Sequence, residues 1–297
     1  MRVDVYTPLL LSLLLPAVSP VIGRRVAPAL AARVLTAAAV LTAAATTWSL
    51  VLLATTLLGS APSVVAEARE DGQRLADPVP AAIGIAACAA LTVVAWRVHR
   101  AVRTERATRR ALRRLAEGHP ADTELIVAAS PVPQAFAIPG RPGRILVTSA
   151  MLSALEPAER RVLLAHERAH LAHRHGALVT AVTLAAAADP LLAPTRRAVA
   201  FLVERWADEQ AAGAVGDRGA TARALARAAL TTCRTRPACA LGFTDRAVTR
   251  RIAALQTAPP PRLWPVALAV LALGALSALC AADATNDMLA LLTSVLF

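Results

Sequence analysis

Residues 34–58 read VLTAAAVLTAAATTWSLVLLATTLL, a stretch without a single charged side chain. An α-helix needs about 20 predominantly apolar residues to cross the hydrocarbon core of a bilayer, which is roughly 30 Å thick. This stretch is long enough to cross the core with some tilt. It therefore predicts a transmembrane helix and places the chain among membrane proteins.

Three further apolar segments, at residues 5–22, 80–98 and 263–282, fit the same pattern. Each has about the length and apolar character of a membrane-spanning helix. The apolar tail at residues 288–297 is too short to cross a bilayer by itself. The predicted fold class is therefore a mainly α membrane protein with about four transmembrane helices.

Two of the apolar segments leave an alternative open. Residues 5–22 could be a signal peptide, but Pro20 follows the small-residue site that cleavage would need, so an uncleaved helix is favoured. Residues 177–192 are apolar yet contain Asp189 and Pro190. They predict either a helix buried in protein or one that dips into lipid, and hydrophobic periodicity does not separate the two.

The composition of the whole chain agrees with a membrane protein. Of its 297 residues, 56% are hydrophobic and 18% are charged, and the mean hydropathy is +0.52. The formal net charge is +12, with arginine in place of every lysine. The arginines cluster beside apolar segments, and the aromatic residues that accompany basic ones in nucleic-acid-binding surfaces make up only 3%. We therefore expect contact with a lipid bilayer and no direct contact with nucleic acid.

The charges between the apolar segments predict the side of the membrane on which each loop lies. Arginine-rich loops stay in the cytoplasm. Arginines follow the first and third segments, whereas acidic residues follow the second; in chain order these are Arg24, Arg25 and Arg33, then Glu67, Glu70, Asp71 and Asp77, then Arg97, Arg100, Arg103, Arg106, Arg109, Arg110, Arg113 and Arg114. The prediction is a multi-pass protein of the cell membrane. Residues 1–98 would carry three transmembrane helices, residues 99–262 would form a cytoplasmic domain, and residues 263–297 would hold the last helix and a short tail.

The cytoplasmic domain is expected to be α+β. Its patterns predict an arginine-rich helix, three short strands in a small antiparallel sheet, and two later helices, at residues 99–117, 124–129, 134–138, 144–148, 156–175 and 195–213. The Pro- and Gly-rich residues 139–143 predict the link between the second and third strands. The helix at 156–175 has Ser153 as its candidate cap and Pro157 in its first turn.

The residues with the clearest chemistry lie in that helix, in the pattern His166-Glu167-Arg168-Ala169-His170. Side chains at i and i+4 lie above one another on a single helix face. Two imidazoles so placed can bind one Zn²⁺ at about 2.0–2.1 Å. Glu167 adjoins that position, where it can take a proton from a zinc-bound water and pass it to a leaving amine. The motif therefore predicts a zinc site with Glu167 as the catalytic base.

A third ligand is available on the helix at 195–213. Glu204 would complete a His₂Glu site with water in the fourth position. Asp208, one turn later, would accept a hydrogen bond from a ligand imidazole and fix its tautomer. The alternative interpretation is a solvated helix face, with incidental histidines in the motif. His173 and His175 are expected on an exposed basic turn.

Together with the strands before them, these residues resemble the gluzincin membrane zinc metallopeptidases. The pattern of that group is an edge strand, a second strand before a small-residue helix start, HExxH and then Glu-x-x-x-Asp. This chain has Gln134-Ala135-Phe136-Ala137, Ile145-Leu146-Val147-Thr148, His166 to His170 and Glu204 to Asp208 in those places. The order of apolar segments is most similar to metallopeptidase family 56, the beta-lactam sensor/transducer type. Family 48, the heat-shock and CAAX-protease type, is related.

The resemblance implies a zincin-like domain in which His166, His170 and Glu204 hold Zn²⁺ and Glu167 is the general base. It also implies that residues 134–137 pair with an extended protein or peptide substrate by β-augmentation. The chain departs from family 48 in having glutamine rather than asparagine at the start of that strand. The antibiotic sensors carry a large domain after the last apolar segment, and we expect none here.

One part of the expected active site is not evident from the sequence. A peptidase needs a group that stabilises the negative oxygen of the transition state. The single tyrosine, Tyr6, is far from the motif, which leaves His173, His175 and Arg205 as candidates.

Two functions of different classes are compatible with these residues. The first is a zinc endopeptidase that cuts a transcriptional repressor, as the resemblance to family 56 suggests, or damaged membrane proteins, as family 48 suggests. The second is a catalytically inactive membrane receptor or scaffold that keeps the helix but not the chemistry. The presence of the ligands, the base and the supporting acid together favours the first.

Overall fold

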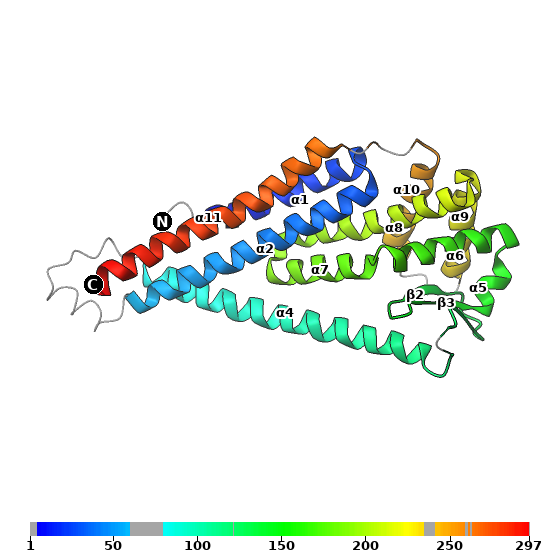
Figure 1. Ribbon diagram of the computed structural model, residues 1–297, viewed down its shortest axis with the longest axis horizontal. Coiled ribbons are helices and arrows are strands. Elements are labelled where there is room, and N and C mark those ends of the chain that lie inside the picture. Colours follow the sequence, from blue (N-terminus) through cyan, green and yellow to red (C-terminus); the bar gives the residue numbers. More distant parts are fainter. Residues whose placement is uncertain are drawn as a thin grey trace.

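The computed structural model describes residues 5–59, 80–120, 122–234, 241–258, 261 and 263–296. Helices make up most of these residues, and a small sheet lies at the end of the molecule far from both termini (Figure 1). The mainly α fold with a small sheet is thus confirmed. The acidic loop that contributes to the predicted orientation, residues 60–79, lies outside the described residues.

Among the described residues, four helices are long and apolar enough to span a membrane, as predicted. They are α1 (Thr7–Arg25), α2 (Pro28–Gly59), α4 (Ala81–Ala116) and α11 (Trp264–Leu296). The apolar tail expected at 288–297 continues α11 as far as Leu296. Large apolar side chains on these helices are exposed, for example Leu10 at 64% and Leu279 at 66%. Such surfaces suit lipid better than water.

α4 continues well beyond its apolar half. The apolar segment and the arginine-rich helix predicted after it form one uninterrupted helix of 36 residues. At 1.5 Å per residue this helix is about 54 Å long. Its last carbonyls meet the first residue of β3, since Arg144 Nη1 donates to the carbonyl of Ala116 at 2.6 Å. α4 therefore links the apolar helices directly to the sheet (Figure 1).

The ambiguous apolar segment at residues 177–192 forms most of α7 (His175–Ala188) and the 3₁₀ turn η1 (Pro190–Leu192). With α8 (Ala193–Val215), the helix predicted at 195–213, they make a helical hairpin. The hairpin packs against α1 and α2, with Val182 and Leu202 in the same buried cluster as Leu35 of α2. Its tip is held by polar contacts: Asp189 Oδ1 accepts from the Leu191 N–H at 3.0 Å. The segment thus packs on helices that can themselves span a membrane.

The sheet has three strands, β1 (Leu125–Ala128), β2 (Ala135–Ile138) and β3 (Arg144–Thr148), in the order β1-β3-β2. β2 pairs with β3 antiparallel, as expected of two strands joined by a short turn. β1 pairs with β3 in parallel, so the prediction of an antiparallel sheet was wrong. Alternation in short strands indicates which side chains face the core but carries no information on strand direction. β2 is left as an edge strand of the sheet.

The remaining helices enclose the sheet and α8. They are α5 (Ser149–Ala154), α6 (Pro157–Ala172), α9 (Arg218–Arg234) and α10 (Leu241–Leu255). Ser153 lies inside α5, so the predicted cap of α6 was wrong. The cap is Glu156, whose N–H donates to Glu159 Oε2 at 2.9 Å. α6 also ends earlier than predicted, because Arg174 adopts a left-handed conformation with φ of 51° and α7 starts in a new direction.

Candidate metal centre

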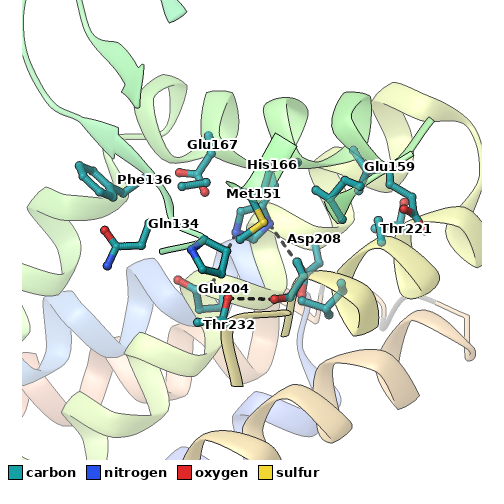
Figure 2. A pocket seen from close by; sticks show the side chains of 18 of the residues that line it. Gln134, Phe136, Met151, Glu159, His166, Glu167, Glu204, Asp208, Thr221 and Thr232 are labelled. Atoms are coloured by element: carbon teal, nitrogen blue, oxygen red, sulfur yellow. Dashed lines mark hydrogen bonds and ion pairs between the residues drawn. The ribbon is translucent and has the colours of Figure 1, made fainter. Parts of the chain in front are cut away.

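The three side chains that could hold a metal come from two helices. α6 carries His166 and His170 one turn apart, and α8, which packs against α6, carries Glu204. One nitrogen or oxygen of each lies within 4.8 Å of those of the other two. Figure 2 shows His166 and Glu204 facing the same pocket, with Asp208 beside them. The structure therefore brings together the three residues predicted as ligands.

The spacing of these atoms suits a small tetrahedral cation. His166 Nε2 lies 3.1 Å from His170 Nε2, and Glu204 has one oxygen 3.6 Å from the first and another 3.7 Å from the second. Bonds of about 2.0–2.1 Å in tetrahedral geometry place ligand atoms roughly 3.3 Å apart. The two Nε2 atoms face each other at about this distance. A single ion bound by both nitrogens would explain that arrangement.

The other nitrogen of each imidazole is already engaged. His166 Nδ1 lies 3.1 Å from Asp208 Oδ1, as predicted for the acid one turn after Glu204. His170 Nδ1 lies 3.1 Å from His175 Nδ1. Metal-binding histidines commonly use their second nitrogen in this way, which fixes ring orientation and tautomer. Both Nε2 lone pairs are thus directed at the same point.

The charges around this point favour a cation. Burial by itself lowers the pKa of His166, but hydrogen bonds from its ring to Asp208 and Glu204 raise that pKa to about 10. Burial raises the pKa of Glu204, whereas His166 and Arg251 lower it by more, so its pKa lies well below the usual value. The site therefore contains a stable carboxylate and stabilises positive charge at His166.

His170 and His175 have the opposite tendency. Burial lowers the pKa of His170 to about 4 and that of His175 to about 3. Both rings are therefore neutral near pH 7. A neutral imidazole has one nitrogen lone pair for a metal or for a hydrogen bond, which is the form that this site needs.

Arg251 of α10 is a functional candidate that the sequence analysis missed. Its guanidinium donates to both oxygens of Asp208, at 2.8 Å from Nε and 2.7 Å from Nη2. Its Nη1 also lies 3.0 Å from Glu204 Oε2. The side chain is only 12% exposed. Neither a motif nor helical spacing connects Arg251 to the histidines, so only the packing of α10 on α8 shows its place.

Glu167 lies on the wall of the pocket, next to the histidines (Figure 2). Burial raises its pKa, an effect that the nearby positive charge of His166 and a hydrogen bond from the Ala137 backbone partly offset. The Ala137 N–H therefore points from β2 toward Glu167. This contact places the edge strand beside the predicted base.

The pocket has a volume of about 400 Å³. Gln134 and Phe136 of the β2 region line one side of it, while Glu159 and Thr221 lie on the opposite side (Figure 2). Ala135 also lines the pocket. The fourth predicted substrate-binding residue, Ala137, is not part of the lining but reaches Glu167 through its backbone. Apolar side chains of α5, α6 and α9 complete the cavity, including Met151, Leu155, Val162, Leu163 and Leu225.

None of the three predicted electrophile candidates lines the pocket. His175 is 1% exposed and packs beneath His170, so the expectation of an exposed turn was wrong for this residue. Its position results from the break at Arg174, which residue patterns do not reveal. Arg205 points to the other side of α8 and donates to the Gly23 carbonyl of α1 at 3.0 Å. His173 stacks on Trp206, with ring centroids 4.6 Å apart.

The fold and the site together define a chain with apolar helices of membrane-spanning length and a two-histidine, one-glutamate cluster that could bind a metal. The profile of Peptidase family M48 matches residues 99–196, which supports a metallopeptidase family. This match covers the sheet, α6 with its HExxH motif, and α7, but ends before Glu204. No curated protein matches the chain, nor does any solved structure.

Proposed function

We propose that the chain is a zinc-dependent metalloendopeptidase of the gluzincin type, anchored in the cell membrane with its catalytic domain in the cytoplasm. The observation that supports this most strongly is the convergence of His166, His170 and Glu204 within 4.8 Å, beside Glu167 and a pocket. The match to family M48 supports the same reaction class. The expected similarity to family 56 stays a prediction.

Zinc is the metal that the donor set suits best. Two imidazole nitrogens and one carboxylate oxygen, with a fourth position left for water, are typical of catalytic zinc sites. The three ligand residues have intermediate exposure, and His166 and Glu204 line the pocket, so water and substrate have access to the open position. When bound, zinc would lower the pKa of a water molecule and polarise the carbonyl of the scissile bond.

Glu167 would act as the general base and then as the general acid. Its carboxylate would take a proton from the attacking water and deliver it to the amine that leaves. Burial raises the pKa of Glu167, which brings the group closer to the range in which it can both accept and release a proton. The Ala137 N–H that contacts it would hold the carboxylate beside the substrate strand.

Arg251 is the best-placed group to stabilise the oxygen of the scissile carbonyl as it becomes negative. Among the described residues that line the pocket it is the one guanidinium. Its contacts with Asp208 and Glu204 fix it next to the ligands. A fixed cation in a site with little water stabilises such charge without having to reorient.

β2 offers the edge along which a substrate would bind. The Thr148 N–H donates to the Gln134 carbonyl at 2.9 Å, so Gln134 has its backbone groups turned toward β3. Backbone groups alternate along an antiparallel strand, which turns those of Ala135 and Ala137 toward the open edge. An extended peptide could therefore form main-chain hydrogen bonds with Ala135 and with the carbonyl of Ala137, because the Ala137 N–H already contacts Glu167.

The position of the site favours substrates at the membrane surface. Glu204 adjoins Arg205, which bonds to Gly23 near the end of α1. The next residue, Trp206, packs under Arg33 of α2, whose guanidinium carbon lies 4.4 Å from the ring centroid. The metal ligand is thus within a residue or two of contacts with two membrane helices. We therefore favour membrane proteins as substrates over a freely diffusing repressor.

The test compares the wild-type chain with Glu167→Gln, purified in detergent. We expect the wild type to contain zinc and to cleave casein or itself, and Glu167→Gln to keep the metal but lose cleavage. Glu117→Gln, an exposed glutamate at the end of α4, is the matched control and should cleave normally. Equal cleavage by wild type and Glu167→Gln, or a wild type without metal, would contradict the proposal.

The orientation has a separate test. A reporter enzyme that works only in the cytosol, fused after Pro120, should be active. This position follows the arginine-rich half of α4, which should stay in the cytoplasm. Activity of a reporter that works only outside the cytoplasm would reverse the proposed topology.

A further inference from the structure

His175 occupies an unusual place for a histidine after a metal motif. It is the first residue of α7, yet its ring is 1% exposed. Its Nδ1 lies 3.1 Å from His170 Nδ1, and the two rings meet edge to face with centroids 4.8 Å apart. In an uninterrupted helix a residue five positions after His170 would point about 140° away from it. The left-handed residue Arg174 makes the contact possible.

Metal binding determines how these two rings share their protons. If His170 Nε2 offers its lone pair to a metal, the proton of the neutral ring must be on Nδ1. Nδ1 then donates, and His175 Nδ1 must accept. The reverse arrangement would put the His170 proton on Nε2, where it would block the ligand position. His175 therefore has one role compatible with a metal, that of acceptor, with its own proton on Nε2.

The surroundings hold the His175 ring firmly. Trp206, itself 3% exposed, packs against it with centroids 4.5 Å apart. Arg33 of α2 covers Trp206. Among the described residues His175 Nε2 has no hydrogen-bond partner, so the ring makes a single polar contact with protein, the one to His170. The buried ring is thus oriented by packing and directed at the ligand.

We propose that His175 is a positioning residue for the metal centre: it accepts the hydrogen bond of His170 Nδ1 and so holds His170 with Nε2 facing the ion. This inference rests on the proposed function, since it assigns a partner to one of the proposed ligands. His166 has Asp208 in the same role. The two ligand histidines would then be oriented by different chemistry, a carboxylate for one and a neutral imidazole for the other.

The experiment measures Zn²⁺ affinity by competition with a chromogenic chelator, using the full chain in detergent. His175→Phe keeps a ring in the cavity but removes the acceptor, and we expect it to lower the affinity by about 10- to 100-fold. His175→Asn offers a side-chain oxygen near the position of Nδ1, and it should recover most of that loss. His173→Phe, next to the same Trp206 but without a contact to a ligand, is the matched control and should bind Zn²⁺ like the wild type.

A second measurement separates positioning from general damage. Co²⁺ in the same site should give a visible spectrum whose intensity and position change in His175→Phe but not in His173→Phe. A cooperative unfolding transition of each metal-free variant would show that the variant is folded. Equal Zn²⁺ affinity in His175→Phe and wild type, or no recovery in a folded His175→Asn, would overturn the positioning role. A wild type that binds no Zn²⁺ would instead remove the proposed function, and this inference with it.

Discussion

Replacing Arg251 by methionine tests whether α10 stabilises the metal centre through its guanidinium. Arg251 contacts Asp208 through two nitrogens and Glu204 through a third. Methionine keeps much of the apolar stem but removes the charge and all donors. The change leaves Asp208, whose side chain is 5% exposed, as a buried carboxylate without its cation.

The expected loss of stability depends on the contacts that Asp208 and Glu204 keep after the substitution. Removing one partner of a buried ion pair costs about 3–5 kcal/mol. Asp208 would keep His166 Nδ1 at 3.1 Å, and the Glu204 side chain is 40% exposed, so water can solvate it. We therefore expect Arg251→Met to lower the free energy of unfolding by about 3 kcal/mol, the lower end of that range. That is a large part of the 5–15 kcal/mol by which a typical domain is stable.

The assay is denaturant unfolding in detergent with a chelator present, so that metal binding does not contribute. Trp206 is 3% exposed, and tryptophan fluorescence should report its exposure. Asp208→Asn and the double variant complete a double-mutant cycle, with an expected coupling energy of about 2 kcal/mol. Arg106→Met, on the exposed face of α4, is the control and should change stability little. A cost below about 1 kcal/mol for Arg251→Met, or a coupling near zero, would refute this reasoning.

Three other predictions concern the metal, the substrate edge and the core. Chelation of zinc should lower the stability of the wild type, by about 2.7 kcal/mol when zinc had been at 100 times its Kd, but leave the unfolding of His166→Ala unchanged; equal responses would argue against zinc at this site. Ala135→Pro removes an N–H at the open edge of β2, so KM should rise about 2- to 10-fold with unchanged stability; an unchanged KM would exclude main-chain pairing there. Leu202→Ala in the buried cluster, where Leu202 is 1% exposed, should cost about 2–5 kcal/mol; Leu230→Ala, at 65% exposed, should cost below about 0.5 kcal/mol, and similar values for both would contradict the packing of the hairpin.

The part of the candidate site that sequence predicts is the part that helical periodicity controls. His166 and His170 share a face because of their spacing, and Glu204 and Asp208 share one for the same reason. Arg251 and His175 could not be found in this way. The packing of a separate helix, α10, places Arg251 at the site. A change of helix direction at a single left-handed residue, Arg174, places His175 there.

In the fold, too, the features that local sequence patterns control could be predicted, and those that depend on packing could not. Apolar length predicts the membrane-spanning helices, because the thickness of the hydrocarbon core sets how many residues are needed. Strand direction in the sheet depends on how the loop before β2 crosses to bring β1 beside β3, which no local pattern records. The hairpin of α7 and α8 was ambiguous because a helix packed in protein and one facing lipid have the same composition. Its contacts with α1 and α2 show which helices it packs on, which composition does not reveal.

The continuity of α4 has a mechanical consequence. Residues 101–116 extend about 24 Å beyond the apolar half of the helix, and no loop interrupts them. A helix changes its tilt when the bilayer becomes thinner or thicker. A change of 10° would displace the far end by about 4 Å, and Arg144, which is bonded to that end, would transmit the movement to the sheet. Arg109 of the same stretch donates to Thr180 of α7 at 3.0 Å, so the movement would reach α7 as well as the sheet.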